Sequence, residues 1–276
     1  MKKISRRSFM AAAAVSVAAL AMTACGGSAS SAASSVASSA ASSEAASTVA
    51  ELTTVEAGKL TMATNATFPP YEMTTDSGEI EGIDVDTAKA IAEKLGLELQ
   101  IDDMDFDAAL LSVQQGKADI VMAGVTVTDE RKAVMDFSDS YATGIQSIIV
   151  PNDSDIASPD DLAGKKIGTQ RGTTGYIYCS DDFGEDSVVA YDNGLTAVQA
   201  LNNGQVDAVV IDNAPATEYV AANPGLKVLD TSYAEEDYAI GMAKGSALED
   251  AINKALEELK EDGTLQSIVD KYINAN

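Results

Sequence analysis

Residues 107–124 read DAALLSVQQGKADIVMAG, which predicts a helix, a glycine that ends it, an aspartate and then a buried strand. Residues 195–212 read LTAVQALNNGQVDAVVID and follow the same plan. The matched positions are Gly116 with Gly204, Asp119 with Asp207, and Gly124 with Asp212. One copy in each half of the folded region predicts two similar lobes. Because helix, glycine and strand often follow one another in proteins, chance similarity is the alternative explanation.

The rest of the folded region, from Lys59 onward, alternates short apolar runs with amphipathic segments. Val85, Ala88 and Ile91, for example, recur at helical spacing, and Gly96 follows as a typical residue at a helix end. We expect strands at 60–64, 97–101, 119–123, 166–169, 188–191 and 206–211, and helices at 84–95, 107–115, 195–203 and 247–260. Strands that alternate with helices predict an α/β fold with mostly parallel sheets.

Two strand ends in the repeat indicate where a ligand would bind. In open α/β sheets, ligands bind beyond the carboxyl ends of the strands. Gly124 and Asp212 lie at such ends, one in each half of the folded region. Asp212 follows the apolar run 208–211, where an unpaired carboxylate is costly to bury. We therefore expect Asp212 to face a cation.

The composition excludes several classes of function. None of the 276 residues is histidine, which removes Ser-His-Asp and Cys-His catalysis and all His-ligated metal sites. The two cysteines, Cys25 and Cys179, are far apart in the sequence, so we expect neither a disulfide framework nor a thiolate cluster. We expect no metal and no cofactor.

The charge argues against nucleic acid as a partner. The formal net charge is −25, and four of the 18 basic residues precede the apolar stretch that begins at Phe9. Without those four, 14 basic residues face 43 acidic ones, which gives a net charge of −29. A surface this acidic repels phosphate backbones.

The N-terminus has the pattern of an export signal. Residues 1–7 are basic, and 9–24 form an apolar run that is short for a membrane span of about 20 residues. The run ends in MTAC, which resembles a bacterial lipobox with Cys25 as the lipid-modified residue. We expect 1–24 to be a signal peptide, with an unlipidated one as the alternative. The segment SRRSFM resembles a twin-arginine signal, although two arginines also fit the general secretory route.

The segment that follows has the composition of a tether. Residues 26–50 contain ten Ser and nine Ala and no aromatic residue, so they bury too little apolar surface to fold. We expect 25–56 to comprise the lipidated Cys25 and a disordered tether. Two acyl chains on one cysteine suffice for stable anchoring. The expected location is therefore the outer face of the cytoplasmic membrane.

Arginine is rare after the signal segment, where only Arg131 and Arg171 remain. Its planar fork suits carboxylates better than lysine does. Arg131 ends the segment AGVTVTDER, in which a strand leads into a turn that Thr128 or Asp129 can cap. Free N–H groups, threonine hydroxyls and a guanidinium together fit a carboxylate receptor. The alternative is a surface arginine that pairs with Asp129 or Glu130.

Two further loops carry candidate ligand groups. Arg171 lies in GTQRGTTG, whose N–H groups favour an anion, but the missing Gly-Lys-Ser/Thr end argues against a nucleotide. The other loop, NATFPPYE at 65–72, is stiffened by two prolines. Phe68 in that loop and Phe106 could face each other across a ligand, with core packing as the alternative.

These segments together resemble the bacterial extracellular solute-binding proteins of family 3, the amino-acid receptors of ABC importers. The likeness runs from about Gly58 to Tyr272. It is carried by TNATFPPYE (64–72), GIDVD (82–86), MDFD (104–107), AGVTVTDER (123–131), DFS (136–138), GTTG (172–175) and DGT (262–264). Each motif is weak alone, but their order and spacing are specific to the family.

The resemblance implies a two-lobed periplasmic-binding-protein-like α/β fold of type II. The chain would cross between the lobes near 145–151 and 235–244. Lobe 1 would comprise 57–146 plus 240–276, and lobe 2 would comprise 147–239. The implied function is that of a monomeric binding protein, not an enzyme, that closes by a hinge on a free amino acid and delivers it to ABC permease subunits.

The resemblance also implies a role for each site residue. Arg131 would bind the α-carboxylate with help from Thr126 and the N–H of Thr174. Asp212 would bind the α-ammonium together with the carbonyl of Gly124. The remaining expected contacts are Phe68 and Phe106, which flank the side chain, and Asn65, Gln170 and Thr173, which read it.

Two departures from the family bear on the ligand. Many relatives that bind basic amino acids have an Asp at the position of Asn65, so its absence favours an uncharged polar side chain. Arg171 is unusual in the Gly/Thr loop. If Arg171 points into the site, an acidic side chain fits instead.

Two other functions compete with transport. A dehydratase-type enzyme on the same fold would need a general acid, for which Glu72, Asp212 and Glu218 are the candidates, and no two carboxylates form a convincing pair. A ligand-sensing module normally continues into a membrane span or a signalling domain. Because the last helical pattern is followed closely by Asn276, we expect a binding protein rather than such a module.

Overall fold

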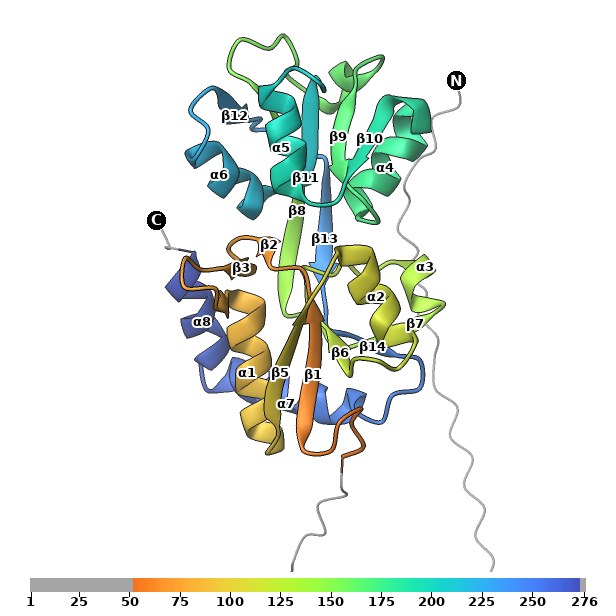
Figure 1. Ribbon diagram of the computed structural model, residues 1–276, viewed down its shortest axis with the longest axis vertical. Coiled ribbons are helices and arrows are strands. Elements are labelled where there is room, and N and C mark those ends of the chain that lie inside the picture. The colour runs from red at the N-terminus through yellow and green to blue at the C-terminus, as the bar shows by residue number, and fades with distance from the viewer. Residues whose placement is uncertain (1–51, 274–276) are drawn as a thin grey trace, which may run out of the picture. The chain divides into compact units, whose positions relative to one another are not determined.

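The computed structural model describes residues 52–273 (Figure 1). The predicted signal peptide, Cys25 and most of the predicted tether lie outside the described residues. The few tether residues that are described contact the folded body. Leu52 packs against the hydrophobic core, and the N–H of Val55 donates a 2.7 Å hydrogen bond to the Asp119 carboxylate. Within 52–273, no helix has the length and apolar character that crossing a membrane requires.

Lobe 1 contains a five-stranded sheet with the order β5-β1-β6-β14-β7. Its strands are β1 (Lys59–Thr64), β5 (Glu98–Asp103), β6 (Ile120–Val121), β7 (Met135–Phe137) and β14 (Gly241–Ala243). Strands β5, β1 and β6 run parallel, and β14 is antiparallel to both β6 and β7.

Helices cover both faces of this sheet. They bury the side chains of its strands, which point alternately to one face and the other. The helices are α1 (Ile83–Leu95), α2 (Phe106–Gln114), α7 (Glu249–Glu261) and α8 (Thr264–Tyr272). Leu60 and Met62 of β1 share a buried cluster with α1, α7 and α8, whereas Ala63 belongs to a cluster with α2.

Lobe 2 contains the second large sheet, with the order β10-β9-β11-β8-β12 and with β13 also paired to β8. Its strands are β8 (Ala142–Pro151), β9 (Ile167–Gln170), β10 (Val188–Tyr191), β11 (Ala208–Asp212), β12 (Leu226–Val228) and β13 (Ala234–Tyr238), and its helices are α4 (Thr174–Phe183), α5 (Gly194–Asn202) and α6 (Asn213–Ala221). Strands β10, β9 and β11 are parallel, and β8 is antiparallel to β11, β12 and β13.

Two strands connect the lobes. β8 and β13 pair from Ala142 opposite Tyr238 to Gln146 opposite Ala234, and both run between the two sheets in Figure 1. After β13 the chain returns to the first sheet as β14. The predicted two-lobed α/β fold with two hinge-crossing strands is therefore confirmed.

The apolar interior continues from one lobe into the other. A single buried cluster contains Leu60 and Ile91 of lobe 1 together with Val198 and Ile211 of lobe 2. A hydrogen bond also joins the lobes, since the Tyr219 hydroxyl on α6 donates to the carbonyl of Thr67 at 2.5 Å.

A small antiparallel sheet lies beside the first one. It consists of β2 (Thr67–Phe68), β3 (Glu72–Thr74) and β4 (Ile80–Glu81). Its register sets Phe68 opposite Glu72, so both side chains are fixed near the carboxyl end of β1. The remaining helices are short: α3 (Asp129–Lys132), η1 (Pro159–Leu162) and η2 (Glu185–Ser187).

The sequence repeat corresponds to a structural repeat. Gly116 and Gly204 follow their helices with φ of 66° and 67°. Asp119 and Thr61 form two hydrogen bonds. The Asp119 N–H donates to the Thr61 carbonyl at 2.9 Å, and the Thr61 N–H donates to the Asp119 carboxylate at 2.7 Å. Asp207 exchanges the same two with Lys166, both at 2.8 Å. In both copies the strand that follows also pairs in parallel, β6 with β1 and β11 with β9, so the repeat is not a chance similarity.

The structure differs from the sequence-based expectation in three respects. The sheets are less parallel than expected, because β8 and β13 cross the hinge in opposite directions and β12 pairs with β8. Helices α6 and α8 were not predicted, although Leu265, Ile268 and Val269 of α8 have the spacing of an apolar face. β6 has only two residues, whereas the predicted strand covered 119–123.

We predict that Asp119→Ala lowers the free energy of unfolding by roughly 2–3 kcal/mol. The reason is that Asp119 is buried and its carboxylate accepts from two N–H groups, those of Thr61 and Val55. Asp207→Ala is the matched control, since Asp207 is exposed and its carboxylate accepts from Lys166. Urea denaturation of both variants checks this, and equal losses would contradict it.

Candidate functional site

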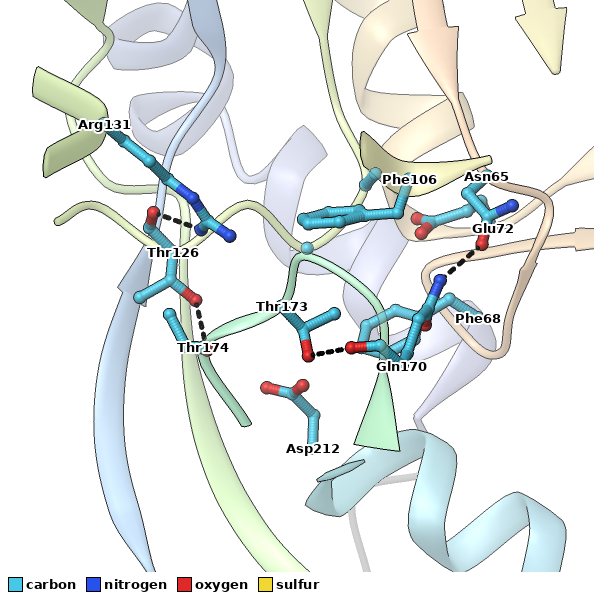
Figure 2. Close-up of a pocket in the computed structure, with 12 residues that line it drawn as sticks. Asn65, Phe68, Glu72, Phe106, Thr126, Arg131, Gln170, Thr173, Thr174 and Asp212 are labelled. Atoms are coloured by element: carbon cyan, nitrogen blue, oxygen red, sulfur yellow. Dashed lines mark hydrogen bonds between the residues drawn. The ribbon is translucent and has the colours of Figure 1, made fainter. Parts of the chain in front are cut away.

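A cavity lies where the strand ends of the two lobes meet. Figure 2 shows the side chains that line it. The lining contains all ten residues expected at the site, namely Asn65, Phe68, Phe106, Gly124, Thr126, Arg131, Gln170, Thr173, Thr174 and Asp212, and in addition Glu72 and Ala123. Residues 65–131 of this set belong to lobe 1, and the others to lobe 2.

Arg131 is buried, with 9% of its surface exposed. The hydroxyl of Thr128 caps the short helix α3 by accepting from the Arg131 N–H at 3.2 Å, which orients the side chain inward. Its guanidinium donates to the carbonyl of Thr126 at 2.8 Å and to that of Gly172 at 3.1 Å, and it lies 5.4 Å from the centroid of the Phe106 ring.

The Arg131 guanidinium forms no ion pair within residues 52–273. The alternative interpretation, a surface arginine paired with Asp129 or Glu130, is therefore wrong. A buried guanidinium that donates to neutral carbonyls can still bind a carboxylate in the bidentate manner.

Helix α4 points its N-terminus at the same part of the cavity. Thr173 caps the helix by accepting from the N–H of Tyr176 at 3.3 Å, and Thr174 is its first residue. The hydroxyl of Thr174 lies 3.5 Å from that of Thr126 across the cavity (Figure 2). N–H groups in the first turn of a helix have no acceptor in their own helix, so this end suits an anion.

Asp212, at the carboxyl end of β11, supplies the negative charge of the cavity on the lobe 2 side. It is 8% exposed and accepts a hydrogen bond from the Tyr238 hydroxyl. Burial raises the pKa of Asp212 to about 7, although the hydrogen bond from Tyr238 opposes this shift. A cation in the cavity would restore its ionised form.

Gly124 occupies a position that excludes a side chain. Its φ is +54°, and a Cβ there would lie 2.7 Å from Cε1 of Phe68. Its N–H donates to the Asp84 carboxylate at 3.0 Å. The turn thereby holds Phe68 against the cavity.

Amides lie at the far end of the cavity from the Arg131 guanidinium. The Gln170 amide donates to Asn65 Oδ1 at 2.9 Å (Figure 2), and the Asn65 amide donates to the carbonyl of Met104 at 2.8 Å. Phe68 and Phe106 are both largely buried and belong to the hydrophobic clusters of lobe 1. They therefore pack in the core and line the cavity at once.

Glu72 is the lining residue whose place at the cavity the sequence did not reveal. Its exposed fraction is 0%, no N–H or hydroxyl group among the described residues donates to its carboxyl oxygens, and the Asp84 carboxyl is in hydrogen-bond contact with it. Burial, followed by the charge of Asp84, raises the pKa of Glu72 well above its usual range. From the sequence, Glu72 was predicted only as a candidate general acid. Its strand pairing opposite Phe68, which brings it to the cavity, could not be predicted from a sequence pattern.

Arg171 lies away from the cavity. Its side chain is 52% exposed and lies 3.5 Å from the carboxylate of Asp192. The cavity lining therefore contains no second arginine that could pair with an acidic ligand side chain. Glu218, one of the three candidate general acids, is also exposed and outside the lining.

Comparison with known proteins defines the family. Residues 60–275 match the family model of bacterial extracellular solute-binding proteins, family 3, and the chain belongs to this family. The chain is 35% identical over 270 residues to the probable histidine-binding protein of Neisseria gonorrhoeae, which covers 95% of this chain and 94% of that protein. Membership in this family makes it a solute-binding protein rather than an enzyme, so the dehydratase alternative is dropped.

Solved structures agree with this. The arginine-, lysine-, histidine-binding protein ArtJ of Geobacillus stearothermophilus superimposes with a TM-score of 0.76 at 34% identity, over 79% of this chain and 96% of that one. An ancestral arginine-binding protein bound to arginine gives 0.75 at 45% identity, over 79% and 99%. An ancestral arginine-binding protein bound to glutamine gives 0.73 at 43%, over 78% and 98%. The proteins it resembles are thus amino-acid-binding members of the family.

We predict that Gly124→Ala destabilises the protein by more than Gly116→Ala. Both glycines have positive φ, which costs any other residue about 1–2 kcal/mol. Only at Gly124 does the added methyl group also collide with Phe68, whereas nothing lies within 4 Å at Gly116. Chemical denaturation measures both losses, and an equal loss in the two variants would show that Phe68 moves away without cost.

Proposed function

We propose that the chain is the extracytoplasmic substrate-binding protein of an ABC importer and that its ligand is a free amino acid. The observation that carries this proposal is that a buried guanidinium and a buried carboxylate, Arg131 and Asp212, line one cavity. A free amino acid is a zwitterion with the complementary pair of charges. Hydrogen bonds to charged groups contribute about 1.5–3 kcal/mol each, so two such ends support micromolar binding, about −8 kcal/mol.

The proposed contacts assign each end of the ligand. Arg131, the Thr126 hydroxyl and the Thr174 N–H bind the α-carboxylate. Asp212 and the carbonyl of Gly124 bind the α-ammonium. The ligand side chain lies between Phe68 and Phe106 and is read by Asn65, Gln170 and Thr173.

The side-chain end favours an uncharged polar group such as a carboxamide. After their bonds to each other and to Thr67, Met104 and Asp192, Asn65 keeps one amide N–H and Gln170 keeps its amide oxygen, and this donor and acceptor together match a carboxamide. Basic side chains are the second candidate, because Glu72 lines the same cavity. The arginine- and histidine-binding relatives are consistent with that second class.

Binding is proposed to close the two lobes around a hinge, with lobe 1 as 57–146 plus 240–276 and lobe 2 as 147–239. Three hydrogen bonds cross the cavity, namely Arg131 to Gly172, Gln170 to Asn65 and that between the hydroxyls of Thr126 and Thr174, and they support a closed form in which the ligand is shielded from water. In this form the protein would dock on the permease subunits.

Location and anchoring are part of the proposal. The signal peptide at 1–24 directs export, and a lipidated Cys25 anchors the tether at 25–56 to the outer face of the cytoplasmic membrane. The supporting observation is the MTAC sequence before a Ser/Ala-rich segment. The protein is proposed to act as a monomer.

We predict that the protein is stabilised by one or a few of the twenty amino acids and that Arg131→Ala abolishes the effect. A ligand at 100 times its dissociation constant adds about 2.7 kcal/mol of stability. Loss of the guanidinium should weaken binding by about 100-fold or more. A thermal-shift screen followed by calorimetry measures this, and Arg171→Ala is the control that keeps full affinity. A folded Arg131→Ala variant with undiminished affinity would overturn the carboxylate assignment.

We also predict that affinity falls in acid. Only ionised Asp212 binds an ammonium, and its pKa in the ligand-free protein is about 7. For a ligand with an uncharged side chain, affinity therefore levels off above pH 7 and falls as the pH drops through 7, by up to about tenfold per pH unit. Calorimetry between pH 5 and 8.5 checks this. In Asp212→Asn the affinity should be weak and should lose this dependence, and an unchanged pH profile in that variant would contradict the assignment.

A further inference from the structure

We propose that Glu72 lets one cavity hold either an uncharged or a cationic ligand side chain, by keeping its proton for the first and releasing it for the second. This inference rests on the proposed amino-acid-binding function and goes on to specify the ligand class. It concerns the side-chain end of the cavity, which Glu72 lines together with Asn65, Phe106 and Gln170.

Within residues 52–273 no cation and no N–H or hydroxyl donor reaches the buried Glu72 carboxyl, and the side chain in hydrogen-bond contact with it is the Asp84 carboxyl. The titratable groups that face it are all acidic or phenolic: Asp84 on α1, Asp103 on β5, Asp212 on β11, Tyr71, Tyr141 and Tyr219. A buried polar group without a partner in a native protein usually serves a ligand or a function.

An ionised carboxylate is very costly to bury without a partner, so the protein without a ligand favours the protonated form of Glu72. Asp84 strengthens this preference, because two neighbouring carboxyls do not both ionise readily. The pKa of Glu72 is raised well above its usual range for these reasons, burial being the larger. A protonated Glu72 is a neutral O–H donor, which suits the carbonyl of a carboxamide side chain.

A cationic side chain reverses this preference. A guanidinium or ammonium near Glu72 stabilises the carboxylate through charge-assisted hydrogen bonds. Binding of a cationic side chain releases one proton from Glu72. The carboxyl O–H bond breaks, the proton leaves to solvent, and the carboxylate pairs with the cation. The net charge of the cavity with its ligand is then the same for both ligand classes. Ancestral arginine-binding proteins bound to arginine and to glutamine are relatives that hold one ligand of each class.

The test is titration calorimetry of the full chain with L-arginine and with L-glutamine at pH 8.0. Each titration is repeated in phosphate and in Tris, because the dependence of the heat on the buffer gives the number of protons released. At pH 8.0 Asp212 is already mostly ionised and contributes little, and equally, to both ligands. We expect more protons to be released with arginine than with glutamine, with about one proton per ligand as the upper bound.

Glu72→Gln is the decisive variant. It should retain glutamine binding, weaken arginine binding by about 10- to 100-fold, and abolish the difference in proton release. Glu81→Gln on the neighbouring strand β4 is the matched control and should behave as the unsubstituted protein. If Glu72→Gln does not fold, the proton count of the unsubstituted protein still decides the question.

Three outcomes would overturn the inference: equal proton release for the two ligands, arginine binding of full strength in Glu72→Gln, or glutamine binding with no arginine binding at all. Each of these leaves the proposed function intact, because an amino acid still binds. If none of the twenty amino acids binds, the proposed function fails first, and the two failures are thereby distinguished.

Discussion

The antiparallel pairing of β8 with β13 is the constraint on which the rest of the structure depends. These two strands carry the chain between the sheets, and they also carry groups that hold the site. Gln146 on β8 donates to the Glu236 carboxylate on β13 at 3.0 Å, and Glu236 also accepts from Thr126 at 3.1 Å. Tyr238, the last residue of β13, donates to Asp212. The parts of the cavity around Thr126 and Asp212 therefore rest on the same pair of strands.

Much of this arrangement was readable in the sequence because it follows from local rules. The repeat of helix, glycine, aspartate and strand predicted two lobes, and its two aspartates make the same hydrogen bonds in each. Strand ends of parallel sheets converge, so Gly124 and Asp212 were expected at one site. Family motifs added residues that follow or end strands, such as Asn65 after β1 and Gln170 at the end of β9, which bond to each other across the lobes.

Other features were out of reach because they depend on contacts between distant parts of the chain. Arg131 and Arg171 both lie in loops after strands, yet one is buried and the other pairs with Asp192 at the surface. No sequence pattern distinguishes these outcomes, since each depends on which loop the opposite lobe covers. The same holds for Glu72, whose carboxyl is deprived of donors by the packing of α1, β5 and β11 around it.

The hydrophobic cluster that runs through both lobes has a thermodynamic consequence. Residues such as Ile91 in lobe 1 and Ile211 in lobe 2 share one apolar interior, so parting the lobes exposes part of it to water. Exposure of apolar surface raises the heat capacity. The proposed lobe closure would therefore carry a negative heat-capacity change of its own, and ligand binding would become more exothermic with rising temperature even though the ligand itself is polar.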